Sequence, residues 1–275
     1  MAKVLRVELK RGFSSLGTMI SLLLGIACIA YKNFYLIRNE LAIKRMLAKL
    51  PEKKYIPVDT KTFYHTWIVG YLDSTNLYLF YFLGIIVALP FGISYYMDKK
   101  NGYIKNICTR IGKQQYLRAK YLSVFITGGT VAFVPVFIDF LLAKLQRPHT
   151  FLRIAGTGLR GHTWWGVFII DHLYLSAVII MAVWFLFGGV LAVFSLLISY
   201  IADNLLTIQL TPFFVMLILF YLPGMFPARY MRYFPYYFLT IFDRGTPLIA
   251  LTEIVPVMVI TYTVFVTIEK RKDVL

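Results

Sequence analysis

Residues 173–202 read LYLSAVIIMAVWFLFGGVLAVFSLLISYIA, and no charged side chain interrupts them. A run of about 18 or more apolar residues predicts a transmembrane helix. At 1.5 Å per residue this stretch would form a helix about 45 Å long, which exceeds the hydrocarbon core of a bilayer, about 30 Å thick. It therefore predicts a membrane span that tilts, bends at Gly188 and Gly189, or protrudes from the bilayer.

Five further apolar runs accompany this one. The chain of 275 residues is 59% hydrophobic and 15% charged, whereas soluble domains contain about 25% charged residues. The runs occupy so much of the chain that no separate soluble domain of usual size remains. The sequence predicts a single all-α integral membrane domain, residues 1–275, with six transmembrane helices. We expect the spans at residues 14–31, 77–97, 121–142, 173–199, 207–222 and 248–268.

The formal net charge of +16 comes from basic residues between the expected spans. Such a charge is also typical of nucleic-acid-binding proteins, but basic loops beside spans contact anionic lipid headgroups. We therefore expect membrane lipid, and no nucleic acid, as a partner. Lys and Arg divide almost equally between the two sides, so they do not orient the chain. An even number of spans places both termini on one side, together with the basic loop 99–120.

The N-terminus carries four basic residues within positions 3–11, followed by the first apolar run. A secretory signal peptide has the same order of charges and apolar residues, and residues 27–30 are small enough for cleavage. The apolar run is long for a signal peptide. We interpret the segment as retained, with a basic amphipathic helix on the membrane surface and a span after it.

Two segments outside the spans are expected to have structure of their own. In the outer segment, residues 32–75, apolar residues recur at helical spacing from Leu36 to Leu50, which predicts a surface amphipathic helix that ends at Pro51. Residues 223–238 combine helix-breaking proline and glycine with many aromatic rings. This composition predicts a re-entrant or interfacial hairpin before the last span.

Motifs for bond chemistry are not found in the sequence. It contains no P-loop, HExxH or GxSxG pattern. Residues 156–161 match GxGxxG but follow no strand, so we attribute the match to chance. Three histidines between His149 and His172 lie near two tryptophans, where interfacial anchoring is favoured over a metal site. We expect no catalytic residue, cofactor or metal in this chain, and no disulfide from Cys28 and Cys108.

Two acidic residues, Asp139 and Glu253, lie within or near expected spans. Charged side chains in a bilayer are costly, so they are candidates for a functional role. Counting along the helices places both towards the membrane face opposite the loop 99–120. Either acid is a candidate for contact with a transported substrate or for a gate. The alternative is a structural ion pair with a nearby base, such as Lys144 or Arg244.

The loop between the second and third spans is the most informative segment, and residues 98–110 read DKKNGYIKNICTR. Gly102 interrupts a helix, and the apolar residues Tyr103, Ile104 and Ile107 then predict a short amphipathic helix with one apolar face. A connector that contacts anionic lipid is the other interpretation of this basic loop.

This loop and the layout around it resemble the permease subunits of bacterial ABC exporters of the ABC-2 class, especially those of Firmicutes. The resemblance covers nearly the whole chain, although only the loop is specific at residue level. It implies a cytoplasmic coupling helix that docks on a separate ABC ATPase, present in two copies and carrying ATP and Mg, and a connecting helix formed by the N-terminal segment. The residues implied in coupling are Gly102, Tyr103, Ile104, Ile107 and Arg110.

The resemblance also implies a second permease subunit, identical or paralogous, and a multi-pass location in the bacterial plasma membrane with both termini cytoplasmic. The expected function is export of an amphipathic cargo, such as an antimicrobial peptide, a drug or a lipid-like molecule, with no enzymatic activity in this chain. One alternative is a sensor or resistance module for peptide antibiotics on the same fold. A lipid-modifying intramembrane enzyme is disfavoured, because His, Asp and Glu do not cluster at one membrane depth. The long outer segment 32–75 departs from the pattern of many members.

Overall fold

The computed structural model describes residues 1–49, 67, 77–146, 164–239 and 246–271. Within these ranges the secondary structure is helical and contains no strand. Five helices are long and apolar enough to cross a membrane. The all-α, multi-pass membrane fold predicted from the sequence is thus confirmed at this level.

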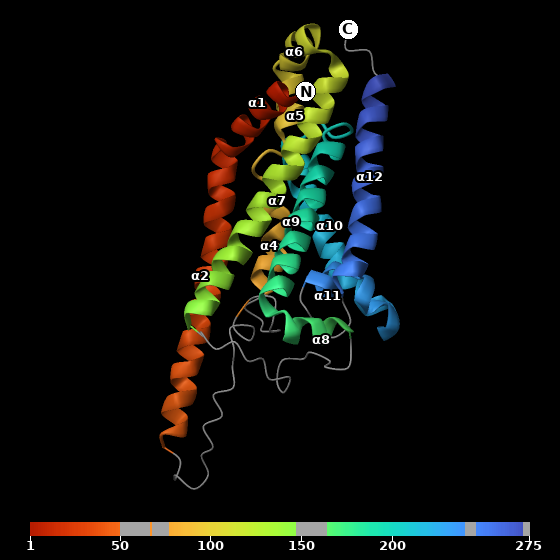
Figure 1. Cartoon of the computed structure of the whole chain (residues 1–275). Helices are drawn as coiled ribbons and strands as arrows, with labels where there is room; N and C mark the ends of the chain where they lie inside the picture. Colours follow the sequence, from red (N-terminus) through yellow and green to blue (C-terminus); the bar gives the residue numbers. More distant parts are fainter. Residues whose placement is uncertain (50–66, 68–76, 147–163, 240–245, 272–275) are drawn as a thin grey trace.

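The long helices run roughly side by side, with α7 and α9 in the middle of the bundle (Figure 1). α2 lies along one side of α7, and α12 lies along the other side of the bundle. Their bounds are α2 (Leu16–Leu47), α7 (Lys113–Gln146), α9 (Leu173–Ile198), α10 (Leu205–Tyr221) and α12 (Pro247–Arg271).

Glycine pairs allow α7 and α9 to pack closely at the centre. A Cβ atom added to Gly188 would lie 2.4 Å from the Cβ atom of Ala132, and one added to Gly128 would lie 2.3 Å from the Cβ atom of Ala192. Small residues at such crossings let membrane helices approach until their backbones touch. α9 continues through Gly188 and Gly189, so the pair serves packing between helices.

The second expected span, residues 77–97, is broken into two helices. α4 (Leu77–Ala88) is followed by turns at residues 89–93 and then by α5 (Ser94–Lys100). Pro90 lacks a backbone N–H and disfavours helical geometry in the preceding residue. The turn is held against the start of α2, because Ser15 Oγ donates a hydrogen bond to the Pro90 carbonyl at 2.8 Å. α4 alone is about 18 Å long, so a sixth span remains a prediction.

The first expected span, residues 14–31, is longer than the sequence predicts. α2 continues without a break from Leu16 to Leu47. The helix expected from Leu36 is therefore present up to Leu47, but as the continuation of α2 and not as a separate helix. The polar residues Lys32 and Asn33, which end the apolar run, are buried in the bundle. No proline or glycine follows them before Leu47, and Pro51 lies outside the described residues.

Short helices lie at both ends of the bundle (Figure 1). α1 (Ala2–Phe13), α5 and α6 (Tyr103–Ile111) gather at one end, where the last turns of α12 also lie. α6 begins after Gly102, whose φ of 69° is in the left-handed region favoured by glycine. α8 (Trp164–Asp171) and α11 (Pro235–Leu239) lie towards the opposite end.

The aromatic segment before the last span forms short helical turns. The 3₁₀ helices η2 (Leu222–Met225) and η3 (Ala228–Tyr233) lead into α11. Trp184 on α9 donates its indole N–H to the Leu239 carbonyl at 3.1 Å, which fixes the end of α11 against α9. The expected pairing of Glu253 with Arg244 falls in residues 240–245, outside the described residues, and the re-entrant depth of this segment remains a prediction.

The close crossing of α7 and α9 predicts that Gly188→Ala lowers the free energy of unfolding by about 1–3 kcal/mol, because overpacking forces the two helices apart. Gly224→Ala is the matched control, since a Cβ atom there would meet nothing within 4 Å; we expect a change within about 0.5 kcal/mol. SDS-induced unfolding in mixed micelles, followed by tryptophan fluorescence, measures both. Equal stability of the two variants would contradict the packing role of Gly188.

Candidate functional site

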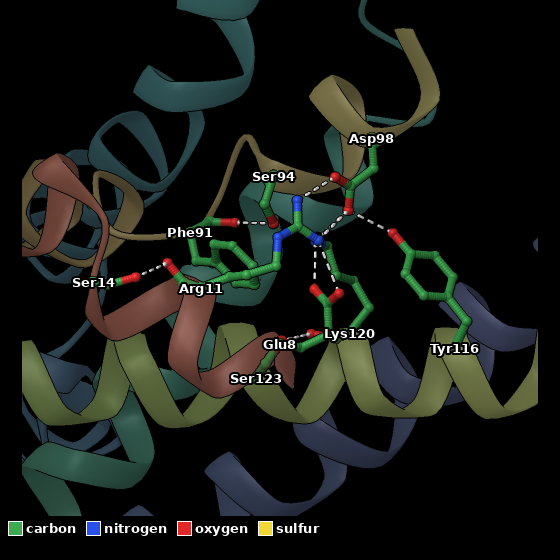
Figure 2. A network of polar contacts seen from close by, with 9 residues as sticks. All are labelled: Glu8, Arg11, Ser14, Phe91, Ser94, Asp98, Tyr116, Lys120 and Ser123. Carbon is green, nitrogen blue, oxygen red and sulfur yellow. Dashed lines mark hydrogen bonds and ion pairs between the residues drawn. The ribbon is translucent and has the colours of Figure 1, made fainter. Parts of the chain in front are cut away.

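A buried ammonium group joins three helices at the end of the bundle that contains α6. Lys120 on α7 donates hydrogen bonds from Nζ to Glu8 Oε2 at 2.9 Å and to Asp98 Oδ2 at 2.6 Å (Figure 2). Glu8 belongs to α1 and Asp98 to α5, and all three side chains are buried. The lysine therefore holds the N-terminal helix and the end of the broken second span against α7.

Two further side chains complete this arrangement. Arg11 donates from Nη2 to Asp98 Oδ1 at 2.6 Å and from Nη1 to Glu8 Oε1 at 2.8 Å. The Tyr116 hydroxyl donates to Asp98 Oδ2 at 2.7 Å. Glu8, Arg11, Asp98, Tyr116 and Lys120 are called the charge cluster below. Its two carboxylates and two cations balance in charge, which is what allows it to be buried.

Asp98 and Arg11 hold each other in their charged forms, and Lys120 adds to the stabilisation of charged Asp98. Burial by itself raises the pKa of Asp98, but the hydrogen bond from Arg11 and the charge of Lys120 outweigh burial and bring the pKa below its ordinary value. Burial likewise lowers the pKa of Arg11, and the hydrogen bond and charge of Asp98 raise it above its ordinary value. Each group therefore stabilises the charged form of the other.

α6 rests on the charge cluster through its apolar face. The Tyr103 ring lies 4.5 Å from the Arg11 guanidinium carbon and 6.4 Å from the Tyr116 ring. Ile104 is only 6% exposed, and Ile107 packs against the core. These side chains are turned towards the charge cluster and the core, and their role in coupling stays a prediction. The exposed face of α6 is polar and consists of Lys105, Asn106, Thr109 and Arg110.

Asp139 is part of a second buried polar group, between α2 and α7. Lys32 Nζ donates to Asp139 Oδ2 at 2.5 Å, and Asn33 Nδ2 donates to Asp139 Oδ1 at 2.9 Å. Gln146 in turn donates to Asn33 Oδ1 at 2.8 Å. Asp139 is fully buried, and both carboxylate oxygens accept from the protein. Asp139 therefore connects α7 to α2.

The structural ion pair considered for Asp139 is present, but its base is Lys32 and not Lys144, the example named from the sequence. Five residues along a helix turn a side chain by about 140°, so Lys144 leaves α7 on a different face. Its ammonium lies 4.7 Å from the centre of the Tyr174 ring. Lys32 fills its place, because α2 continues past the expected end of the first span and carries Lys32 to the level of Asp139.

Glu253 on α12 faces a cavity of about 300 Å³ between α9, α10, α11 and α12. It is the only charged side chain among the residues that line this cavity. Within the described part of the chain, no side chain forms an ion pair or a hydrogen bond with its carboxylate. The aromatic lining residues are Phe187, Phe194, Tyr233, Phe234 and Phe238. The structure therefore separates the two acids found in the sequence, since Asp139 is paired and Glu253 borders open space.

A larger groove of about 800 Å³ lies between α7 and α9 and has no charged lining residue. Its walls include Phe133, Phe137, Phe140, Tyr174 and Phe185. Nowhere in the described ranges do three His, Cys, Asp or Glu side chains come together as metal ligands would. His149, His162 and the GxGxxG match lie outside the described residues. Glu253 in its cavity, and the charge cluster under α6, are thus the candidates for function.

Comparison with known proteins gives no family assignment: no family model matches the sequence, and no curated protein or solved structure matches it significantly. The resemblance to ABC-2 permeases comes from residues 98–120 and from the expected layout of the spans, and it stays a prediction. Function is therefore inferred from the geometry of the chain itself.

The charge cluster is not evident from spacing in the sequence. Glu8 is the only acid among the first 39 residues, and Asp98 stands beside the basic pair Lys99 and Lys100. An acid isolated in a basic segment next to a span is the signal that points to such a cluster, because a buried base then needs it as a partner. Lys120, at the edge of the third apolar run, is that base.

The buried pair predicts that Lys32→Met and Asp139→Leu each lower the free energy of unfolding by about 3–5 kcal/mol, because each leaves one buried charge without a partner. The double variant removes both charges and is expected to recover most of this loss. SDS-induced unfolding in mixed micelles measures all three, with Lys144→Met as a control expected within about 0.5 kcal/mol of the parent. Additive losses in the double variant would contradict an ion pair.

Proposed function

We propose that this chain is the permease subunit of an ATP-driven ABC exporter, which moves an amphipathic cargo out of the cell. In this proposal ATP binds and is hydrolysed in a separate ABC ATPase, present in two copies, and a second permease subunit completes the transporter. The observation that carries the proposal is the position of α6. It is an amphipathic helix at one end of an apolar bundle. Its polar face is exposed, and its apolar face rests on the charge cluster that joins α1, α5 and α7.

A path of direct contacts leads from α6 into the bundle. Tyr103 contacts Arg11 and Tyr116, and these residues bind Asp98 beside Lys120 on α7. α7 packs along α9 through the glycine crossing, and α9 forms a wall of the cavity that contains Glu253. A displacement of α6 by a partner would therefore move α1 and α7 together, because separating the cluster leaves buried charges without partners.

The exposed surface at this end is basic. Lys105 and Arg110 on α6 and Lys99 and Lys100 at the end of α5 are exposed. In the proposed function this face contacts an acidic surface on the ATPase, while the inward residues Tyr103 and Ile104 connect the contact to the spans. In this division of roles, Arg110 belongs to the contact with the ATPase, and Tyr103, Ile104 and Ile107 transmit its displacement.

The proposed orientation places α6, α1 and both termini in the cytoplasm, because ATP is available there. The cavity with Glu253 is built near α11, towards the other end of the bundle, so it lies closer to the outer face in this orientation. A cargo taken from the membrane or the cytoplasm would pass through the α9–α12 side of the bundle before release.

The proposed ATPase contact predicts that Lys105→Glu with Arg110→Glu reduces the amount of associated ATPase about tenfold, because two attractive contacts become repulsive. The control is Arg229→Glu with Arg232→Glu. It makes the same change of charge in η3, which lies towards the opposite end of the bundle. Affinity-tagged chain is purified from native membranes, and the associated P-loop subunit and its vanadate-sensitive ATP hydrolysis are measured. Absence of a P-loop subunit from the unaltered complex, or equal loss in both variants, would contradict the proposal.

A further inference from the structure

The carboxylate of Glu253 is turned towards the inside of the bundle by the face of α12 that it occupies. Its neighbours Ile254 and Val257 line the same cavity. The other face of α12 carries large apolar side chains that are well exposed, including Val255 and Val259. The helix therefore presents apolar residues to its surroundings. Glu253, the one acidic residue between Pro247 and Thr267, lies on the side of the cavity.

A half-buried carboxylate in this position is stabilised in its ionised form by a cation. Removing an ionised group from water is costly unless an opposite charge or hydrogen-bond donors replace the lost solvation. No described side chain supplies either to Glu253. The contrast with Asp139, whose two oxygens accept from Lys32 and Asn33, shows how this chain satisfies an acid when the role is structural.

The lining of the cavity selects the kind of cation. Calcium and magnesium are bound by about six or more oxygen ligands, whereas Glu253 is the only carboxylate among the lining residues. Aromatic faces attract organic ammonium groups, and ligand ammonium ions are commonly bound among aromatic side chains. Phe187 and Phe238 lie edge to face with centroids 5.9 Å apart, and both line the cavity. An apolar, aromatic wall with one carboxylate therefore matches an organic cation.

The size of the cavity limits the group that enters it. A volume of about 300 Å³ is at the lower end of the range for ligand pockets, about 300–1,000 Å³. It accommodates an ammonium group with a ring or a short alkyl chain, either as a small molecule or as one end of a longer amphiphile.

We propose that this cavity is a binding site for a cationic amphiphile, with its ammonium group at Glu253 and its apolar part among Phe187, Phe234 and Phe238. The inference identifies the class of cargo that the transporter moves, and this step rests on the proposed function. Anionic amphiphiles are excluded from it by the charge of Glu253.

Binding is tested on the purified protein with its associated subunits in nanodiscs of zwitterionic lipid. The probe is tritiated phenylbutyltrimethylammonium, and the competitor is its tert-butyl isostere, in which a carbon atom replaces the nitrogen. We expect saturable binding of the probe, weaker by about tenfold or more in Glu253→Gln, because the charge contact is lost while the shape is kept. Glu253→Asp should retain most of the affinity, and Asp171→Asn, which removes an exposed acid in α8, should leave it unchanged.

Equal affinity of the ammonium probe for the unaltered protein and for Glu253→Gln would overturn the proposal. The proposal would also be overturned if the neutral isostere competed as strongly as unlabelled probe. Either result would mean that the charge of the ligand does not contribute to binding in the cavity. Binding does not require ATP, which separates the two proposals. If the ATPase copurifies but the probe does not bind at Glu253, only this inference fails. If the probe binds in a Glu253-dependent way but no ATPase copurifies, only the exporter proposal fails.

Discussion

The arrangement of the helices depends on one constraint: a charge buried in an apolar bundle must meet its opposite. α7 carries two such charges, Lys120 and Asp139, which are separated by about 28 Å along the helix. Lys120 is neutralised by Glu8 and Asp98, and Asp139 by Lys32. These pairs fix α1, α5 and α2 on one central helix at two levels. In surroundings as apolar as the helices themselves, hydrophobicity alone does not choose which helix lies beside which.

The same constraint bears on Glu253, for which no described side chain supplies a partner. Where the chain uses acids as ties, it supplies cations from another helix, whereas Glu253 faces a cavity lined by aromatic and aliphatic side chains. Lys120 ties α1 and α5 to α7 at one end, and Asp139 ties α2 to α7 farther along the same helix. The cavity with Glu253 lies on the other side of the bundle, between α9, α10, α11 and α12. In the proposed function, the ties pass on a displacement of α6 and the cavity holds the cargo.

Much of the fold follows from the sequence because membrane helices are encoded locally, by hydropathy over about 20 residues. Residues 173–202 predict α9 almost to its ends, and Gly102 predicts the start of α6. Pro90 marks the break in the second expected span, and the apolar spacing after Leu36 indicates that a helix follows the first. The burial of Lys32 and Asn33 depends on neighbouring helices, so the local pattern does not reveal it. The ion pairs join residues as far apart as 107 and 112 positions, a distance at which periodicity carries no information. The acids were recognisable as candidates, but only the packing shows which of them is paired.

In the proposed function, the end of the bundle with α6 and the charge cluster faces the cytoplasm, where an ATPase can reach it. The most direct measurement places single cysteines at Asn106 in α6 and at Asp171 in α8, both exposed positions, in a background where Cys28 and Cys108 are serine. An impermeant maleimide is applied to intact cells and to permeabilised cells. The account predicts that the cysteine at position 171 is labelled in intact cells, and the cysteine at position 106 only after permeabilisation. Labelling of position 106 in intact cells would contradict it.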